Sequence, residues 1–204
     1  MRNKVSRNGF IPIQQINIFS TKLNYDHNVE LSELCISNKD DKWNDNPNSS
    51  KYEDSYLPEH KYVDYFTEEI RKLFYKIDRR LYLDRLWSLI LTESETTMIH
   101  NHYDVRDHYN LFLSWVYYPM LPVGMEGGQL KFQTWENGRN KNFAMIPEAG
   151  MIIVFPSWIN HYTTRNEKGG IRLSISGNMK IKEKDYESVY YDRNSNIHNF
   201  LGKR

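Results

Sequence analysis

Apolar residues recur every three or four positions between residues 61 and 82. This is the spacing of one face of an α-helix, and charged residues occupy most of the intervening positions. The pattern predicts an amphipathic helix from about Lys61 to Tyr82, with its apolar stripe buried against the rest of the fold. The stripe consists of Val63, Phe66, Ile70, Leu73, Phe74, Ile77 and Leu81.

After residue 84 the pattern changes to short apolar segments of strand length, and no periodic segment of helix length lies between them. Asn137-Gly138 separates two of these segments, and this dipeptide favours a two-residue hairpin turn. The pattern predicts a mostly β, antiparallel sandwich or barrel with helical support from the first half of the chain. The predicted strands are 85–92, 96–100, 111–118, 129–134, 142–146, 151–155 and 171–179.

The rest of the chain gives weaker patterns. Residues 10–19 are rich in isoleucine and predict a strand, and residues 28–36 predict a short helix. Residues 37–60 are polar enough to predict a long loop, which we interpret as a lid that orders on ligand binding. Residues 180–204 predict a polar tail. No composition shift marks a domain boundary, so we expect a single domain over residues 1–204.

Charge and cysteine content exclude several protein classes. The chain has 27 basic and 26 acidic residues, a formal net charge of +1, which makes nucleic acid an unlikely partner. Its single cysteine, Cys35, excludes an internal disulfide and a cysteine-rich zinc module, and a reducing cytoplasm is the expected location. No apolar run approaches the roughly 18 residues of a membrane span, and the basic N-terminus is not followed by the apolar segment of a signal peptide.

Candidate metal ligands lie close to the ends of two predicted strands. His102 and Asp104 are two positions apart, so on a strand they share a face and can reach one metal ion. His161 follows the most apolar predicted strand and is available as a third ligand. Two histidines and one carboxylate leave other positions of the metal open, as in non-haem Fe(II) oxygenases. Taken singly, each residue has a simpler structural interpretation that is favoured: His102 as a hydrogen-bonded rim histidine and Asp104 as a turn residue.

A second candidate site lies eleven residues beyond His161. Arg172 and Ser174 share one strand face, so a guanidinium and a hydroxyl can hold the same carboxylate. This pair suits a cosubstrate with two carboxylates. The simpler alternative is that Arg172 pairs with Glu167.

In order and context these residues resemble the Fe(II)- and 2-oxoglutarate-dependent oxygenases, specifically their prolyl-hydroxylase-like branch. The resemblance spans about residues 85–179. Beyond the histidines and Arg172-X-Ser174, it rests on Tyr117-Tyr118, on Gly127-Gly128-Gln-Leu-Lys-Phe and on Phe155-Pro-Ser-Trp-X-X-His. The last motif, followed by Arg-X-Ser, is similar to the one found in a group of short bacterial and phage members of this branch. The resemblance implies a double-stranded β-helix, or jelly-roll.

The resemblance also implies an activity and a set of ligands. Fe(II) would be bound by His102, Asp104 and His161. 2-Oxoglutarate would chelate the metal, and its distal carboxylate would be bound by Arg172, Ser174 and Tyr118. With dioxygen, oxidative decarboxylation of 2-oxoglutarate would be coupled to hydroxylation of an unknown primary substrate, a protein side chain or a small molecule. Three further residues are expected to contact substrate, namely Tyr103, Arg106 and Tyr109.

One departure from the family pattern concerns the first motif. In related short sequences it often reads His-X-His-Pro, which here maps to His100-Asn101-His102. The spacing to the tyrosine pair and the presence of a carboxylate favour His102 and Asp104 as ligands. His100 would then be a neighbour that supports the ligands without binding the metal. Retention of Asp104 also argues against a halogenase, which needs that position for halide.

Two alternatives from other classes accompany the oxygenase hypothesis. The first is a non-catalytic jelly-roll protein with a binding or structural role, derived from the same scaffold. The second is a cupin-like enzyme with another metal, although cupins usually present three histidines. A protein without the enzyme's chemistry has no reason to keep Arg172 and Ser174 together with the metal ligands.

Overall fold

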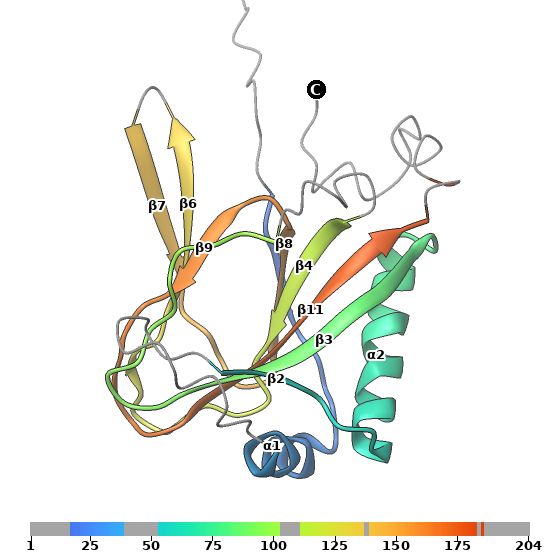
Figure 1. Ribbon diagram of the computed structural model, residues 1–204, viewed down its shortest axis with the longest axis horizontal. Coiled ribbons are helices and arrows are strands. Elements are labelled where there is room, and N and C mark those ends of the chain that lie inside the picture. The colour runs from blue at the N-terminus through green and yellow to red at the C-terminus, as the bar shows by residue number, and fades with distance from the viewer. Residues whose placement is uncertain (1–16, 39–52, 103–110, 137–138, 183–184, 186–204) are drawn as a thin grey trace, which may run out of the picture.

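The computed structural model describes residues 17–38, 53–102, 111–136, 139–182 and 185 (Figure 1). Within these residues the chain forms two helices and eleven strands. In chain order these are β1 (Phe19–Lys22), α1 (Asn28–Ser37), β2 (Glu53–Tyr56), α2 (Lys61–Ile77), β3 (Leu81–Leu91), β4 (Leu111–Tyr117), β5 (Glu126–Gly127), β6 (Leu130–Glu136), β7 (Arg139–Met145), β8 (Met151–Pro156), β9 (Asn160–Thr163), β10 (Asn166–Lys168) and β11 (Arg172–Ile181).

The strands form one large and two small antiparallel sheets. The large sheet has the order β1-β8-β4-β11-β3-β2, and the three-stranded sheet has the order β7-β6-β9. The strands β10 and β5 make a separate pair. Figure 1 shows the three-stranded sheet on one side of the large sheet and helix α2 on the other. This arrangement confirms the prediction of a mostly β jelly-roll with helical support from the first half of the chain.

Helix α2 covers the outer face of the large sheet. Its apolar stripe is buried there against Trp115 and Tyr117 of β4, both fully buried, and against Ile175 of β11. Fully burying a large apolar side chain contributes about 1.5–3 kcal/mol, so this layer supplies much of the stability of the sheet. The buried helix residues are Val63, Phe66, Ile70 and Phe74.

A second apolar cluster fills the space between the large sheet and the three-stranded sheet. Strand alternation divides β4 between the two clusters: Trp115 and Tyr117 face helix α2, whereas Val116 and the following Tyr118 face the interior. The period-two alternation along the sequence Trp115-Val116-Tyr117-Tyr118 predicts this division. The cluster consists of Val116, Tyr118, Leu130, Phe132, Ile153, Phe155 and Ile159.

The helix predicted to end near Tyr82 ends at Ile77, and this part of the prediction is wrong. The carboxylate of Asp78, next in the chain, accepts a hydrogen bond of 2.9 Å from the backbone N–H of Arg80, and β3 begins at Leu81. Leu81 packs into the same core as the helix stripe, but from a strand. The apolar spacing therefore continues past the end of the helix.

Within the described residues, no helix has the length and apolar character of a membrane span.

Other elements also differ from the predictions. The strand predicted at residues 96–100 does not form, and only His100 makes a β-bridge, to His161. Residues 10–16 of the first predicted strand lie outside the described residues; residues 17 and 18 are not in a strand, and β1 begins at Phe19. Strand β2, at Glu53–Tyr56, pairs with β3, so the loop prediction is wrong for those residues. The lid remains a prediction, because residues 39–52 are not described.

Three further predictions concern a hairpin, the end of a strand and a short helix. The pairing of Glu136 with Arg139 leaves two residues between β6 and β7, which confirms the predicted hairpin. Strand β11 continues to Ile181, so residues 180 and 181 belong to this strand and not to the predicted tail. The short helix predicted at residues 28–36 is confirmed as α1.

Candidate metal and cosubstrate site

Three histidines converge between the two larger sheets. His161 lies on β9, and an antiparallel bridge joins it to His100, with N–H···O distances of 3.0 and 2.8 Å in the two directions. His102 follows two residues later, and its backbone N–H donates to the carbonyl of Ser157 at 2.8 Å. One ring nitrogen from each histidine lies within 4.8 Å of the other two. This spacing suits three ligands of a single metal ion.

The rings of His100 and His161 are held by backbone carbonyls. The Nδ1 of His100 lies 2.8 Å from the carbonyl oxygen of Met98, and the Nδ1 of His161 lies 2.9 Å from that of Ile159. Because a carbonyl only accepts hydrogen bonds, each Nδ1 carries the proton. In the neutral form of each ring the lone pair is therefore on Nε2, the atom that would bind a metal.

The ring of His102 is held by two polar side chains. Its Nδ1 lies 2.8 Å from Oδ1 of Asn178 and 2.9 Å from Oγ of Ser114. The Ser114 hydroxyl itself donates to Asn178 Oδ1 at 2.9 Å, so both side chains are fixed. With Nδ1–H donating to this pair, His102 also presents Nε2. Hydrogen bonds of this kind orient metal-bound histidines.

Burial keeps the inner two rings neutral. Removal from water lowers the pKa of His102 to about 4, and it holds the pKa of His161 well below its usual range. The neighbouring imidazoles add to this effect, since a second positive charge nearby is unfavourable. Both rings are therefore unprotonated near neutral pH, which is the form that binds metals.

Aromatic rings surround the histidines. The ring of Phe155 packs 4.7 Å from that of His161, and Trp87 of β3 lies 5.4 Å from His102. Phe132 contacts His161 at 6.2 Å and stacks on Phe143 of β7 at 5.1 Å. Phe143 is 38% exposed, so a series of rings leads from the histidines to the surface.

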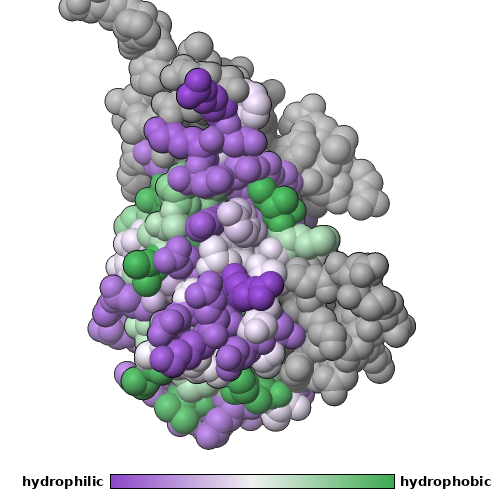
Figure 2. All heavy atoms as spheres, turned by 90° about the vertical axis from the view of Figure 1, so that its left-hand side faces the viewer, coloured by the Kyte–Doolittle hydropathy of each residue, from purple (hydrophilic) through white to green (hydrophobic). Residues whose placement is uncertain are grey.

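That surface lies on the side of the molecule formed by β6, β7 and β9. The hairpin of β6 and β7 extends beyond the other strands (Figure 1). Figure 2, which views this side, shows hydrophilic residues towards the projecting end of the hairpin and separate hydrophobic patches below it. The aromatic series therefore meets solvent on a surface of mixed polarity, where a substrate can approach.

Arg172 occupies the start of β11, on the face that also carries Ser174 and Asn178. Its side chain is fully buried and donates to the carbonyl of Gly128 at 3.0 Å and to the Ser174 hydroxyl at 3.3 Å. It also donates to the Tyr118 hydroxyl at 3.2 Å and lies over the Tyr118 ring. The sequence predicted these three side chains to act together, and the structure brings them into contact.

No carboxylate among the described residues pairs with Arg172, and Glu167 is exposed at the surface. Burial lowers the pKa of the Arg172 guanidinium and raises that of the Tyr118 phenol. An uncompensated buried charge costs several kcal/mol. An anionic ligand would offset that cost, and the Tyr118 hydroxyl, being neutral, can donate to the same anion.

The Gly127-Gly128 pair makes room for this arginine. Gly127 has φ +77°, and a Cβ there would overlap the carbonyl oxygen of Arg165. Gly128 has φ +62°, and a Cβ there would lie 3.0 Å from Cδ of Arg172. Only glycine adopts both conformations without strain. The Gly-Gly motif therefore shapes the backbone that presents the Gly128 carbonyl to Arg172.

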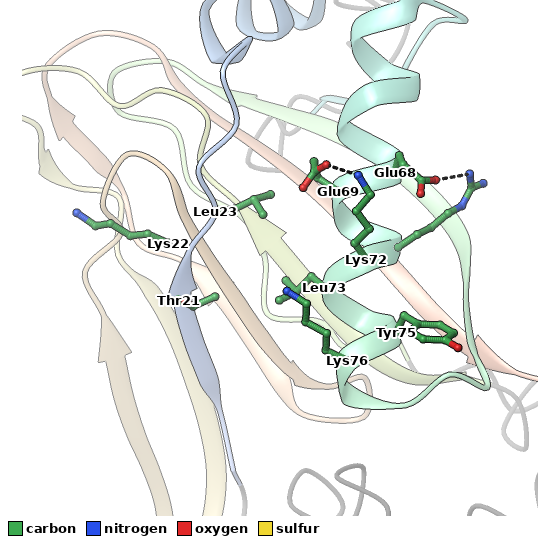
Figure 3. Close-up of a pocket in the computed structure, with 10 residues that line it drawn as sticks. Thr21, Lys22, Leu23, Glu68, Glu69, Lys72, Leu73, Tyr75 and Lys76 are labelled. Atoms are coloured by element: carbon green, nitrogen blue, oxygen red, sulfur yellow. Dashed lines mark hydrogen bonds and ion pairs between the residues drawn. The ribbon is translucent and has the colours of Figure 1, made fainter.

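A groove of about 650 Å³ lies elsewhere, between β1 and α2 (Figure 3). Its charged side chains largely neutralise one another: Lys72 pairs with Glu69 at 2.8 Å, and Arg71 with Glu68 at 3.9 Å. These are exposed pairs of the kind that commonly cover a helix surface. The groove is on the helix side of the large sheet, away from the histidines, and forms no part of the site.

The structure thus assembles five of the residues predicted from sequence, namely His102, His161, Arg172, Ser174 and Tyr118. Asp104, Tyr103, Arg106 and Tyr109 lie outside the described residues, so their roles remain predictions. His100 was expected behind the ligands, whereas its ring lies beside them as a third possible donor. The sequence reasoning missed Ser114 and Asn178; the position of Asn178, on the face shared by Arg172 and Ser174, was the available signal.

Comparisons with known proteins agree with this geometry. Residues 85–178 match the model of a family described as "Putative 2OG-Fe(II) oxygenase". The chain is similar to a prolyl-4-hydroxylase from Pseudomonas putida, with 18% identity, a TM-score of 0.60, and coverage of 81% of this chain and 92% of that one. No sequence among curated proteins matches the chain.

Two further solved structures share the fold. A Trichoplax adhaerens prolyl hydroxylase, in complex with a peptide fragment of the hypoxia inducible factor oxygen degradation domain, has 12% identity and a TM-score of 0.61, covering 84% of this chain and 86% of that one. A viral collagen prolyl hydroxylase from Paramecium Bursaria Chlorella virus-1, in complex with 2-oxoglutarate, has 13% identity and a TM-score of 0.56, covering 81% and 96%. At these identities the structures establish the fold alone.

The family implies Fe(II), 2-oxoglutarate and dioxygen, and the residues present fit the first two. The histidines offer neutral nitrogen donors at metal-ligand spacing. The buried Arg172, which has no carboxylate partner in the part of the chain that the structure describes, offers its charge to a carboxylate. Residues 85–178, which contain both features, match the model of the 2OG-Fe(II) oxygenase family, and the chain shares its fold with prolyl hydroxylases.

Proposed function

We propose that this chain is an Fe(II)- and 2-oxoglutarate-dependent dioxygenase that hydroxylates a C–H bond of its primary substrate. One observation carries the proposal: the histidine cluster and a buried Arg172, which has no carboxylate partner among the described residues, border the same apolar cluster, through Phe155 and Tyr118 respectively. When bound, Fe(II) would supply the reaction of dioxygen that converts 2-oxoglutarate to succinate and CO₂ and oxidises the substrate. The protein's own residues bind, orient and enclose these reactants.

We assign His102 and His161 as two of the metal ligands, a proposal supported by the sequence motifs and by the convergence of the two rings. The hydrogen bonds at each Nδ1 fix the ring orientation and keep Nε2 available. Because the rings are already neutral and held in place, little reorganisation accompanies metal binding. The sequence motif offers Asp104 as the third ligand, in the two-histidine, one-carboxylate set that leaves positions open for reactants.

Arg172 would bind the distal carboxylate of 2-oxoglutarate. The guanidinium can donate two parallel hydrogen bonds to a carboxylate, and the hydroxyls of Ser174 and Tyr118 lie 3.3 and 3.2 Å from its nitrogens. The three groups together select a dicarboxylate of fixed length, because the other end must reach the histidines. Apolar rings around His161 would exclude water from the reacting atoms.

The primary substrate would approach between Trp87 and the β6–β7 hairpin. Trp87 borders His102, and Phe143 continues the aromatic series to the surface. A protein side chain on an extended peptide, or a small molecule with an apolar part, would fit these rings. The similar structures are prolyl hydroxylases, one of them in complex with a peptide, which supports a peptide as the first class to test.

The competing proposal is a non-catalytic jelly-roll protein. Such a protein gains no stability from a buried guanidinium that lacks a carboxylate partner, since an apolar residue of similar size costs less to bury. Retention of Arg172 beside the histidine cluster therefore favours the enzyme.

Anaerobic reconstitution tests the proposal. Fe(II) and 2-oxoglutarate added together should give a weak visible charge-transfer band, because the chelated keto acid accepts charge from the metal. His161→Ala should abolish the band, and Arg172→Ala should weaken the affinity for 2-oxoglutarate. A wild-type protein without the band, and an Arg172→Ala variant with unchanged affinity, would show that the assignment is wrong.

A further inference from the structure

We infer that His100, in place of Asp104, is the third protein ligand, so that three neutral imidazoles hold the metal. This inference rests on the proposed function and concerns how its metal centre is built. The sequence favours the Asp104 carboxylate as the third ligand and gives His100 only a supporting role. In this inference the His100 imidazole takes the place of that carboxylate.

The backbone brings the three rings together. His100 and His161 exchange both hydrogen bonds across an antiparallel bridge, so their side chains emerge side by side on one face. Their ring centroids are 4.4 Å apart. His102 follows His100 by two residues, and its ring stacks on that of His100 at 5.4 Å with an interplanar angle of 20°. The strand geometry thus gathers His100 and His102 beside His161.

The ring of His100 is also oriented like a ligand. An exposed histidine without a role is expected to remain solvated, whereas the Nδ1 of His100 donates to the Met98 carbonyl at 2.8 Å. This bond leaves Nε2 as the lone-pair atom, as in His102 and His161. All three rings therefore have the same tautomer and present the same kind of donor.

Only one of His100 and Asp104 can be the third protein ligand, because the metal also needs open positions for its reactants. Three protein ligands on one Fe(II) would leave positions open for 2-oxoglutarate and for dioxygen. A fourth protein ligand would take one of these positions. Because the described geometry already supplies three converging donors, the carboxylate of Asp104 is not required.

The consequence is a more positive metal centre. Three neutral imidazoles leave the full 2+ charge of Fe(II) at the site, whereas a carboxylate would reduce it by one. In a partly buried site this difference strengthens the attraction for anions, including the doubly charged 2-oxoglutarate. A three-histidine centre therefore complements a cosubstrate that is itself bound by charge at Arg172.

Cobalt titration of the full chain tests the ligand assignment without relying on turnover. Co(II) binding is measured by calorimetry and by visible absorption for wild type, His100→Ala and Asp104→Asn. Loss of a group that only supports a ligand weakens metal affinity by about 10–100-fold. We expect His100→Ala to weaken Co(II) binding by more than about 100-fold and Asp104→Asn by less than about tenfold.

A rescue experiment separates ligation from folding. In His100→Gly, added imidazole can enter the space of the missing ring, and it should restore the wild-type Co(II) absorption. His100 is exposed, so this substitution leaves the core intact. Absence of rescue, with the variant folded as judged by circular dichroism, would overturn the inference.

The outcomes also distinguish this inference from the proposed function. A loss of more than about 100-fold in Asp104→Asn overturns the three-histidine centre, although the dioxygenase assignment stands, since a metal would still bind. Wild type that binds no Co(II) at all overturns both. Near-wild-type affinity in His100→Ala likewise overturns the three-histidine centre.

Discussion

Replacing Arg172 with methionine should remove the stabilisation that 2-oxoglutarate gives to the folded chain. In wild type loaded with Co(II) without oxygen, 2-oxoglutarate at 100 times its Kd should stabilise the fold by about 2.7 kcal/mol. For a chain of this length, each kcal/mol raises Tm by about 2–4 °C, so the expected shift is about 5–11 °C.

The variant loses two charge-assisted hydrogen bonds to the carboxylate, each contributing about 1.5–3 kcal/mol. A loss of about 3 kcal/mol or more weakens the Kd by more than about 100-fold. At the same concentration the remaining stabilisation is then at most about 0.4 kcal/mol, a Tm shift of under about 2 °C. Burial of Arg172 without a carboxylate partner among the described residues is what motivates this expectation.

Differential scanning fluorimetry with and without 2-oxoglutarate measures both shifts, and each variant is compared with its own ligand-free Tm. Arg165→Met is the matched control, because the Arg165 side chain is exposed; its shift should equal that of wild type. An Arg172→Met variant that keeps the wild-type shift would refute the assignment of Arg172 to the cosubstrate.

Three further predictions concern stability and metal binding. Gly127→Ala should lower the free energy of unfolding by about 2–4 kcal/mol, from strain and overlap, whereas Gly124→Ala, with φ +71° and no atom within 4 Å of the new Cβ, should lose only about 1–2 kcal/mol in urea titrations; equal losses would contradict the packing argument. Burial raises the pKa of the Cys35 thiol from 9.0 to about 12, so its contribution to stability is complete below pH 9 and is lost as the pH rises above it, by about 2–3 kcal/mol at pH 11. The free energy of unfolding, measured from pH 8 to 11, should therefore decline less steeply in Cys35→Ala than in wild type. Identical slopes would show that ionisation of this thiol does not destabilise the fold. Asn178→Ala should weaken Co(II) binding by about 10–100-fold, by releasing the Nδ1–H of His102; unchanged affinity would mean that this hydrogen bond does not orient the ligand.

Local periodicity predicted the parts of the fold that depend on which face a residue occupies. Alternation along β4 placed Trp115 opposite Tyr118, and the same rule placed Arg172 with Ser174. These predictions hold because a strand fixes the direction of each side chain without reference to its partner. The hairpin at Asn137-Gly138 followed in the same way, from the backbone angles that its turn requires.

Features that depend on pairing partners could not be predicted. The contact between His100 and His161 arises from a bridge between segments 61 residues apart, which no local pattern encodes. The helix boundary was missed for a related reason: Leu81 contributes to the same core from β3, so hydrophobicity alone did not distinguish strand from helix. Asn178 shares a strand face with Arg172 and Ser174, but that position does not by itself reveal its partner, His102.

Formation of succinate from 2-oxoglutarate is the most direct test of the central claim. The full chain is incubated with Fe(II), 2-oxoglutarate and dioxygen, and succinate is measured by mass spectrometry; slow turnover should occur even without a primary substrate. The account predicts succinate that depends on all three components, is absent in His161→Ala and is strongly reduced in Arg172→Met. Binding of both metal and 2-oxoglutarate without any succinate, across candidate peptide and small-molecule substrates, would contradict it.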